Sequence, residues 1–159
     1  MVGLFPVVSL SPISLEEANN CLSKWEHKMG PLNRPQFEED QCFGLIGDRG
    51  LHGVITQSQL ISKNVAGRTD LTRANTCEVS RLCAARPHIC RAVLRLWREF
   101  VFPDSGYQFV ISYQDADLHN GNTYRFDGWK KIGESRSGPD RRSGRKGRNK
   151  VIWMWSLER

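Results

Sequence analysis

The sequence lacks the features that mark membrane, secreted and zinc-binding proteins. Its five cysteines are scattered over residues 21–90 without a Cys-x-x-Cys pair, so neither a disulfide framework nor a structural zinc site is expected. Its apolar runs fall short of the about 20 residues that cross a bilayer. The first residues have neither a basic n-region nor a small-residue cleavage site. We therefore expect a cytoplasmic protein without membrane contact.

The sequence has a positive charge that is concentrated in one segment. The chain has 159 residues and a formal net charge of +6, and residues 130–150 alone contain nine basic and two acidic residues. This segment therefore has a net charge of +7, and the rest of the chain sums to −1. Such a pattern is typical of a surface that binds a polyanion. A solvated loop that only aids solubility is the alternative.

Hydrophobic periodicity predicts alternating strands and helices. The predicted strands are residues 5–10, 42–46, 51–61, 76–84, 107–113, 129–135 and 151–157. The predicted helices are residues 14–29, opened by a Ser-x-x-Glu capping box, about 89–101, and 120–127. Residues 62–75 are polar and predict a loop. The order predicts a single α/β domain with a mixed sheet over residues 1–159, with a basic loop at about 136–150.

The junction between the strand at 76–84 and the next helix carries the first functional signal. Arg86, His88 and Arg91 surround a helix start, where free N–H groups favour an anion. With the later run Asn122–Trp129, this order resembles the GNAT acyltransferase superfamily. The resemblance implies that Tyr124 protonates a leaving thiolate. It also implies that the junction holds the pyrophosphate of acyl-coenzyme A through Leu82, Cys83, Arg86, His88, Ile89, Cys90 and Arg91.

The phosphate loop of that superfamily, Arg/Gln-x-x-Gly-x-Gly/Ala, is incomplete in this chain. It aligns with Arg86-x-x-Ile89-x-Arg91, which has neither glycine. Bulky side chains hinder the close approach of the backbone to a pyrophosphate. The residues therefore favour the fold of the superfamily more than its usual coenzyme.

A narrower resemblance covers about residues 76–135. The runs Ile111–Asp115 and His119–Tyr124, followed by Trp129 and Gly133, are similar to the Mom family of phage DNA modification proteins. That family combines a Ser-Tyr-x-Asp strand end with a His-x-Gly-x-x-Tyr element and also lacks the paired glycines. The segment Trp25–Pro31 resembles the family's His-containing segment.

This resemblance implies that the enzyme adds a carbamoylmethyl group to the exocyclic N6 of adenine in phage DNA, in the host cytoplasm, which protects the DNA from restriction. An exocyclic amine is a poor nucleophile, so a general base and a general acid are expected near an extruded base. By position, Tyr124 is the acid or relay candidate and Ser112 orients substrate or moves a proton. His27 is the base candidate, with Glu78 a second one.

The DNA-contact candidates are Asp115, His119, Arg141, Arg142, Arg145, Lys146 and Arg148, on double-stranded DNA. Asp115 and His119 could instead contribute to an iron site, although no two-His-one-carboxylate spacing is evident. Trp153 and Trp155 share a strand face, which favours packing over base stacking.

Two other functions remain open. One is an acyl-coenzyme A-dependent N-acetyltransferase that acts on a protein or a small amine. The other is a non-catalytic nucleic-acid-binding module on the same fold. A homodimer is compatible with each of these functions.

Overall fold

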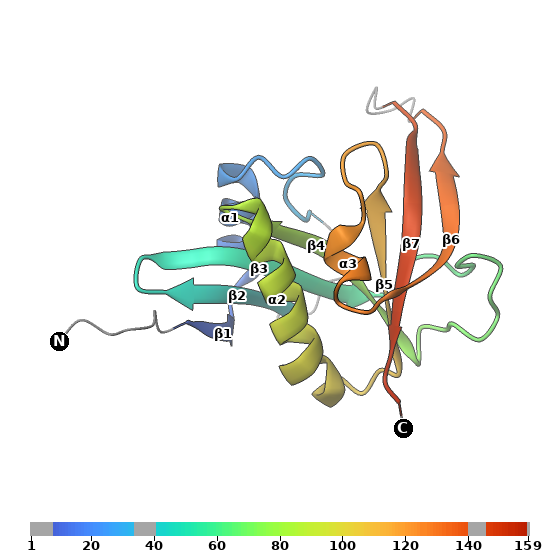
Figure 1. The fold of residues 1–159 in the computed structure, drawn as a ribbon, viewed down its shortest axis with the longest axis horizontal. Coiled ribbons are helices and arrows are strands. Elements are labelled where there is room, and N and C mark those ends of the chain that lie inside the picture. The colour runs from blue at the N-terminus through green and yellow to red at the C-terminus, as the bar shows by residue number, and fades with distance from the viewer. Residues whose placement is uncertain (1–7, 34–40, 140–145, 159) are drawn as a thin grey trace. The chain divides into compact units, whose positions relative to one another are not determined.

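The computed structural model of the chain describes residues 8–33, 41–139 and 146–158. Its strands are β1 (Ser9–Pro12), β2 (Cys42–Gly47), β3 (Gly50–Gln59), β4 (Thr76–Ala84), β5 (Phe109–Asp115), β6 (Lys130–Ser137) and β7 (Arg148–Ser156). Its helices are α1 (Leu15–Lys24), α2 (Pro87–Phe100), the 3₁₀ helix η2 (Phe102–Asp104) and α3 (Asn122–Arg125) (Figure 1). The strands form a seven-stranded mixed sheet in the order β1-β2-β3-β4-β5-β7-β6, which confirms the predicted α/β class.

The chain divides into two compact units, each described by itself. Unit 1 comprises Met1–Ser58 with Ser80–Ser105, and unit 2 comprises Gln59–Val79 with Gly106–Arg159. No helix within the described parts of either unit is long and apolar enough to span a membrane.

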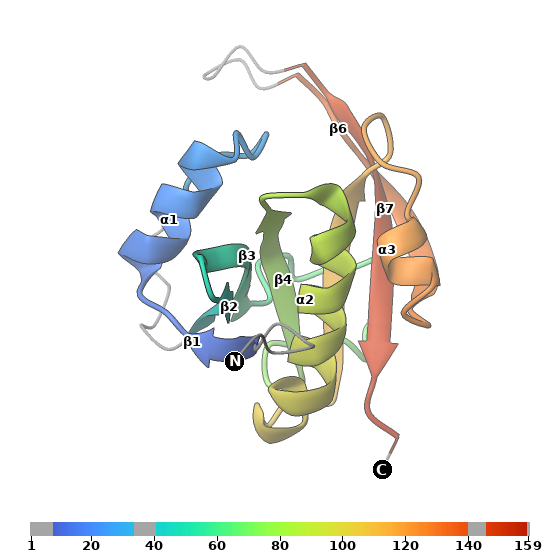
Figure 2. The same cartoon turned by 60° about the vertical axis from the view of Figure 1, so that its left-hand side comes forward.

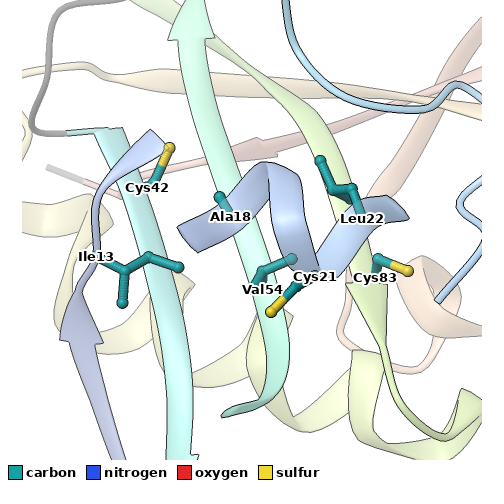
Figure 3. Packing of buried hydrophobic residues seen from close by; sticks show 7 residues of the cluster. All are labelled: Ile13, Ala18, Cys21, Leu22, Cys42, Val54 and Cys83. Atoms are coloured by element: carbon teal, nitrogen blue, oxygen red, sulfur yellow. The ribbon is translucent and has the colours of Figure 1, made fainter. Parts of the chain in front are cut away.

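In unit 1, two helices cover opposite faces of the strands (Figure 2). α1 begins at the predicted capping box, since the Ser14 hydroxyl accepts from the Glu17 N–H at 3.1 Å and the Glu17 carboxylate accepts from the Ser14 N–H at 2.8 Å. The apolar side of α1 packs on β2, β3 and β4 through the cluster Ile13, Ala18, Cys21, Leu22, Cys42, Val54 and Cys83 (Figure 3). The neighbouring Gly53 faces α2, where a Cβ would come within 2.6 Å of Val93.

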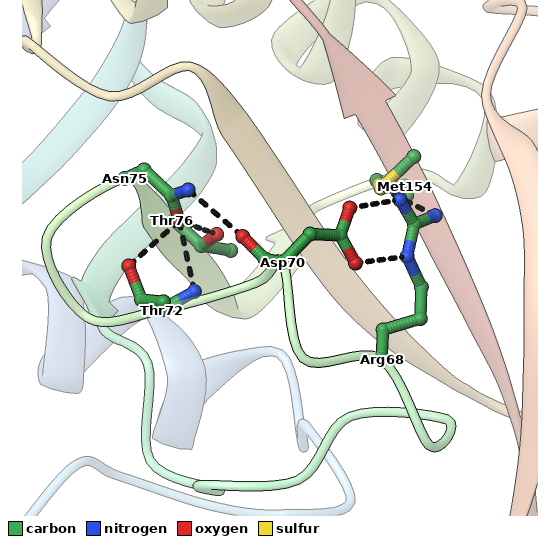
Figure 4. A network of polar contacts seen from close by, with 6 residues as sticks. All are labelled: Arg68, Asp70, Thr72, Asn75, Thr76 and Met154. Atoms are coloured by element: carbon green, nitrogen blue, oxygen red, sulfur yellow. Dashed lines mark hydrogen bonds and ion pairs between the residues drawn. The ribbon is translucent and has the colours of Figure 1, made fainter.

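In unit 2, β5 pairs in parallel with β4 and antiparallel with β7, which also pairs with β6. One face of these strands is covered by the loop 60–75, whose apolar residues join Ile111, Ile152 and Met154 in a core. Figure 4 shows how polar contacts hold this loop. The Asn75 Oδ1 accepts from the Thr72 N–H at 2.8 Å, and Arg68 contacts both Asp70 and the sulfur of Met154. A segment without helix or strand is thereby ordered over the sheet.

Several predicted boundaries differ from the observed ones. α1 ends at Lys24 rather than continuing to residue 29, because Glu26 has a φ of 52°, which a helix does not accommodate. The first strand is Ser9–Pro12, and its predicted start at 5–7 lies outside the described residues. Arg136 and Arg148 belong to β6 and β7 rather than to a basic loop, because the hairpin pairs them with Asn149 and Ser137.

Candidate active site

A buried hydrogen bond between two hydroxyl groups joins β5 to α3 in unit 2. The Ser112 Oγ and the Tyr124 Oη are 2.8 Å apart, and either atom can be the donor. Ser112 is 2% exposed and Tyr124 is 9% exposed. Ser112 pairs with Val79 at the last position of the β4–β5 ladder, although both strands continue beyond it. The carboxyl ends of parallel strands are where α/β sheets bind ligands, so the two motifs that the sequence singled out meet at such a place.

Two tryptophans hold the ring of Tyr124. The Trp153 ring stacks on it with centroids 5.8 Å apart and an interplanar angle of 14°. The Trp129 ring meets its edge at 5.4 Å, and the Trp129 N–H donates to the Asp127 carboxylate at 2.9 Å. Both tryptophans are buried. The prediction that Trp153 is a packing residue rather than a base-stacking one is confirmed, and the residue it packs against is Tyr124.

Gln114 joins β5, β7 and the segment that leads into α3. The Trp153 N–H donates to the Gln114 Oε1 at 2.7 Å, and the Gln114 amide N–H donates to the carbonyl of His119. Gly121 follows with a φ of 77°, and a Cβ there would lie 2.6 Å from the Gln114 Oε1 and 2.8 Å from Trp153. The segment can approach the strands this closely only because residue 121 is glycine. Sequence reasoning named neither Gln114 nor Gly121 as a site residue.

Strand alternation places Glu78 and Asp115 on the other face of the sheet from Ser112. Glu78 pairs with Ile111, which belongs to the core under the loop 60–75, and Glu78 is 7% exposed. Burial, with a smaller contribution from the Glu78 charge, raises the pKa of Tyr113 to about 12. The Lys150 Nζ lies 5.7 Å from the centroid of the Tyr113 ring. This second face therefore combines a buried carboxyl group with a phenol that stays neutral at physiological pH.

Asp115 has a local structural role at the end of β5. Its carboxylate accepts from the Asp117 N–H at 3.1 Å and lies 3.8 Å from the Arg148 guanidinium. Its carbonyl accepts from the His119 N–H at 3.0 Å, while the His119 side chain is exposed. Asp115 therefore lies on the other face of β5 from Ser112, and the His119 side chain faces solvent. Among the residues that the structure describes, no three His, Cys, Asp or Glu side chains gather to hold a metal ion, so the iron site gains no support.

In unit 1, the start of α2 has the charge expected of an anion site. Arg86 is the N-cap residue, in extended conformation and without a side-chain capping bond, and Pro87 opens a helix of 14 residues with no acid in its first turn. The side chains of Arg86, His88 and Arg91 are exposed. Pro87 has no N–H, and the Ile89 N–H donates to the Arg86 carbonyl at 3.0 Å, so the three exposed basic side chains supply most of the positive charge at this helix start.

The remaining residues predicted at this junction pack inside unit 1. Ile89 approaches the Cβ position of Gly53 at 3.4 Å, and Cys83 belongs to the core beneath α1. Burial raises the pKa of Cys90 to about 11, so its thiol is protonated and not a nucleophile near neutral pH. Leu82 is half-buried in β4. These four residues shape the junction, and the side chains of the three basic residues are exposed beside it.

His27 lies in the turn that follows α1. Its Nδ1 accepts from the Met29 N–H at 3.2 Å, and its carbonyl accepts from the Gly30 N–H at 2.7 Å. In a neutral imidazole whose Nδ1 accepts a hydrogen bond, the proton is on Nε2. The Nδ1 of His27 therefore has a backbone partner in the turn, and the role of His27 as a general base stays a prediction.

Part of the predicted DNA surface lies outside the described residues, namely Arg141, Arg142 and Arg145. Lys146 and the half-buried Arg148 are described, and Arg148 lies beside Asp115. By composition, unit 2 contains 14 basic and eight acidic residues, whereas unit 1 contains nine of each. The whole net charge of the protein therefore belongs to the unit that contains Ser112 and Tyr124.

No protein-family model matches the sequence, and no curated protein matches it. Solved structures match the fold along nearly the whole chain. A GNAT-family protein of Chromobacterium violaceum is 15% identical over 94% of this chain and 87% of its own, with a TM-score of 0.63. The ribosomal-protein-S18-alanine N-acetyltransferase of Escherichia coli is 12% identical over 96% of each chain, with a TM-score of 0.63. Arabidopsis thaliana NAA60 in complex with acetyl-CoA is 9% identical over 95% of this chain and 100% of its own, with a TM-score of 0.62.

At these identities the likeness concerns the fold, and it confirms the predicted GNAT-like architecture. The narrower resemblance to the Mom family stays a prediction. A shared fold alone does not assign a reaction, which has to be argued from the site.

Proposed function

We propose that this protein transfers an acyl group from acyl-coenzyme A to an amine nitrogen. The observation that carries the proposal is the buried hydrogen bond of 2.8 Å between Ser112 and Tyr124, located where the parallel ladder of a GNAT-like sheet ends. A tyrosine hydroxyl with a hydroxyl partner can supply a proton to a leaving group and be resupplied.

The donor would be held at the start of α2 by Arg86, His88 and Arg91. These basic side chains suit the diphosphate of a coenzyme A, although the usual glycines are absent. Bound acyl-coenzyme A would supply an activated acyl carbonyl and a thiol leaving group. NAA60, which shares the fold, was solved with acetyl-CoA. The anion contacts in this chain would come mainly from side chains rather than from a glycine-rich backbone.

Two protons move in this reaction. The Tyr124 Oη–H would give its proton to the leaving sulfur and regain one through the Ser112 hydroxyl. The new bond forms between nitrogen and the acyl carbon as the carbon–sulfur bond breaks. The proton that the attacking amine loses would pass to water, because Glu78 lies on the other face of the sheet from Ser112 and Tyr124.

Removal of the two arginines at the start of α2 should weaken coenzyme binding without unfolding the protein. Each charge-assisted hydrogen bond contributes about 1.5–3 kcal/mol, so Arg86→Ala with Arg91→Ala should raise the Kd for coenzyme A at least about tenfold, measured by calorimetry. Arg95→Ala, on the same helix but paired with Glu99 at 3.2 Å, is the matched control. Equal affinity of the double variant and the control would show that the donor does not bind at this helix.

A second candidate function is the attachment of a carbamoylmethyl group to the N6 amine of adenine in DNA. This reaction forms an N–CH₂ bond rather than the amide bond of acyl transfer, so it needs a donor other than a simple acyl thioester. Two observations favour it. Hydrogen bonds join the Ser-Tyr-x-Asp and His-x-Gly-x-x-Tyr elements through Ser112 with Tyr124 and through Gln114 with His119. The excess of basic residues lies in the same unit. This candidate retains the predicted DNA contacts, which include Asp115, His119 and the basic residues from Arg141 to Arg148.

Nucleoside mass spectrometry distinguishes the two acceptors. If DNA is the substrate, DNA from bacteria that express the protein should contain a deoxyadenosine heavier by a carbamoylmethyl group, because the tyrosine acid and the basic unit act on the same molecule. DNA from cells that express Tyr124→Phe at equal soluble level should lack it. Unmodified deoxyadenosine with wild-type protein would leave a protein or small amine as the acceptor.

A further inference from the structure

We propose that Asn120 is a self-modification site, where attack by the chain's own backbone converts the side-chain amide into aspartate and isoaspartate. Asn120-Gly121 is the one Asn-Gly pair in the sequence. It lies in unit 2, in the segment that leads into α3, the helix that contains Tyr124. The inference rests on the proposed function only for the effect of this modification on transfer.

The reaction needs no molecule other than water. The Gly121 backbone nitrogen forms a bond to the Asn120 Cγ as the bond between that carbon and the amide nitrogen breaks. The amide nitrogen leaves as ammonia, with the proton that Gly121 loses. Water then opens the cyclic imide at either of its carbonyls, which gives aspartate or isoaspartate. Glycine favours the attack because it has no Cβ to hinder the approach of its nitrogen.

Three observations show that Asn120 is prepared for this reaction. Its side chain is exposed, so water and hydroxide reach it. Its Oδ1 accepts from the Asn122 N–H at 3.0 Å, a bond that polarises the amide carbonyl and stabilises the negative charge that the attack places on this oxygen. Among the described residues, the Gly121 N–H donates to no acceptor. No hydrogen bond of this nitrogen therefore has to break before it attacks.

The one Asp-Gly pair in the sequence, Asp127-Gly128, shows how the fold prevents the same reaction. Asp127 is 7% exposed, and its carboxylate accepts from the Trp129 indole N–H at 2.9 Å. The Gly128 N–H donates to the carbonyl of Arg125 at 3.2 Å. An attack here would have to break both hydrogen bonds in a buried place. The sequence marks both pairs alike, and the structure protects Asp127 while it prepares Asn120.

Isoaspartate at residue 120 would displace the site tyrosine. Its backbone runs through the former side chain, so the chain gains one methylene just before Gly121. Gly121 has little room to move towards the strands, because even a Cβ there would lie 2.6 Å from the Gln114 Oε1. The Gly121 carbonyl also accepts from the Tyr124 N–H at 3.1 Å. A shift of Gly121 therefore moves Tyr124 and its hydroxyl away from Ser112.

Peptide mapping of protein kept at slightly alkaline pH tests the site without any need for activity. The peptide that contains residue 120 should gain the mass difference between an amide and an acid, and isoaspartate should appear in it. The rate should rise with pH, because the attacking nitrogen must lose its proton. Asn120→Gln, which would have to close a larger ring, should leave this peptide unmodified over the same period. Asn122→Gln keeps the backbone N–H at residue 122, so it is the matched control and should react like the wild type.

The comparison of Asn120 with Asp127 tests the part that the fold has in the reaction. In the folded protein, isoaspartate should form at residue 120 and not at residue 127. After unfolding in urea it should form at both residues, because the hydrogen bonds that protect Asp127 are lost. An unmodified Asn120 in the folded wild type, or equal isoaspartate at both residues, would overturn the proposal.

Transfer activity tests the consequence for the site. The wild type should lose turnover in proportion to its isoaspartate content, while Asn120→Gln kept under the same conditions should retain its turnover. An isoaspartate methyltransferase, which returns isoaspartate to aspartate, should restore the lost turnover. Undiminished turnover of fully modified protein would overturn the link between residue 120 and Tyr124. If the fresh wild type transfers no acyl group, the proposed function fails, while the peptide map still decides whether Asn120 is modified.

Discussion

Replacement of Tyr124 by phenylalanine is expected to lower the rate of transfer by about 10²–10⁴-fold while the protein stays folded. The substitution removes only the hydroxyl that lies 2.8 Å from Ser112, and the phenyl ring keeps its stacking on Trp153. Loss of one buried hydrogen bond should reduce the free energy of unfolding by only about 1 kcal/mol. Turnover and thermal unfolding of the same preparation are the two measurements.

Tyr107→Phe provides the matched control, because it removes the same hydroxyl from a tyrosine just before β5. It should leave turnover near the wild-type value. Ser112→Ala should lower turnover less than Tyr124→Phe, since it removes the partner that returns the proton rather than the donor itself. Full activity of Tyr124→Phe would eliminate the tyrosine as acid. Loss of folding in that variant would make Tyr124 a core aromatic residue.

Among substitutions that add one methyl group near the site, Gly121→Ala is expected to lower the free energy of unfolding the most. A left-handed backbone conformation costs a residue with a Cβ about 1–2 kcal/mol. Overpacking adds about 1–3 kcal/mol, because the new Cβ would lie 2.6 Å from Gln114 and 2.8 Å from Trp153. The free energy of unfolding should therefore fall by about 2–5 kcal/mol in urea titration. Turnover should also fall, since the segment that leads to Tyr124 must move away from the strands.

Gly106→Ala separates the two contributions. Gly106 has a φ of 80°, similar to that of Gly121, but a Cβ there would meet nothing within 4 Å. This variant should lose only the backbone contribution, about 1–2 kcal/mol, and keep its turnover. If both alanine variants lose the same free energy, the close contact of Gly121 with Gln114 and Trp153 is not what requires glycine.

Local chemistry was enough to predict most of the elements of this protein. The Ser14 capping box started a helix where predicted, since its two bonds lie within four residues of the chain. The β-prone run at 76–84 and the β-rich run at 107–113 predicted strands, which are observed at Thr76–Ala84 and Phe109–Asp115. The motifs also singled out Ser112 and Tyr124 as candidates. Each of these features depends on neighbours in sequence.

Only the tertiary structure decided which candidates meet. The Gln114–Trp153 bond joins residues 39 positions apart, and no local pattern predicts such a pair. Because side chains alternate along a strand, the sequence shows that Ser112 and Asp115 point to opposite faces of the sheet. The residues that pack against each face depend on the order of the strands, which the sequence does not show. Arg81 in β4 likewise donates to the carbonyl of Gly30, which lies 51 positions earlier in the chain. Contacts between residues that are far apart in the sequence arise only when the whole chain packs. The geometry of the candidate site depends on such contacts.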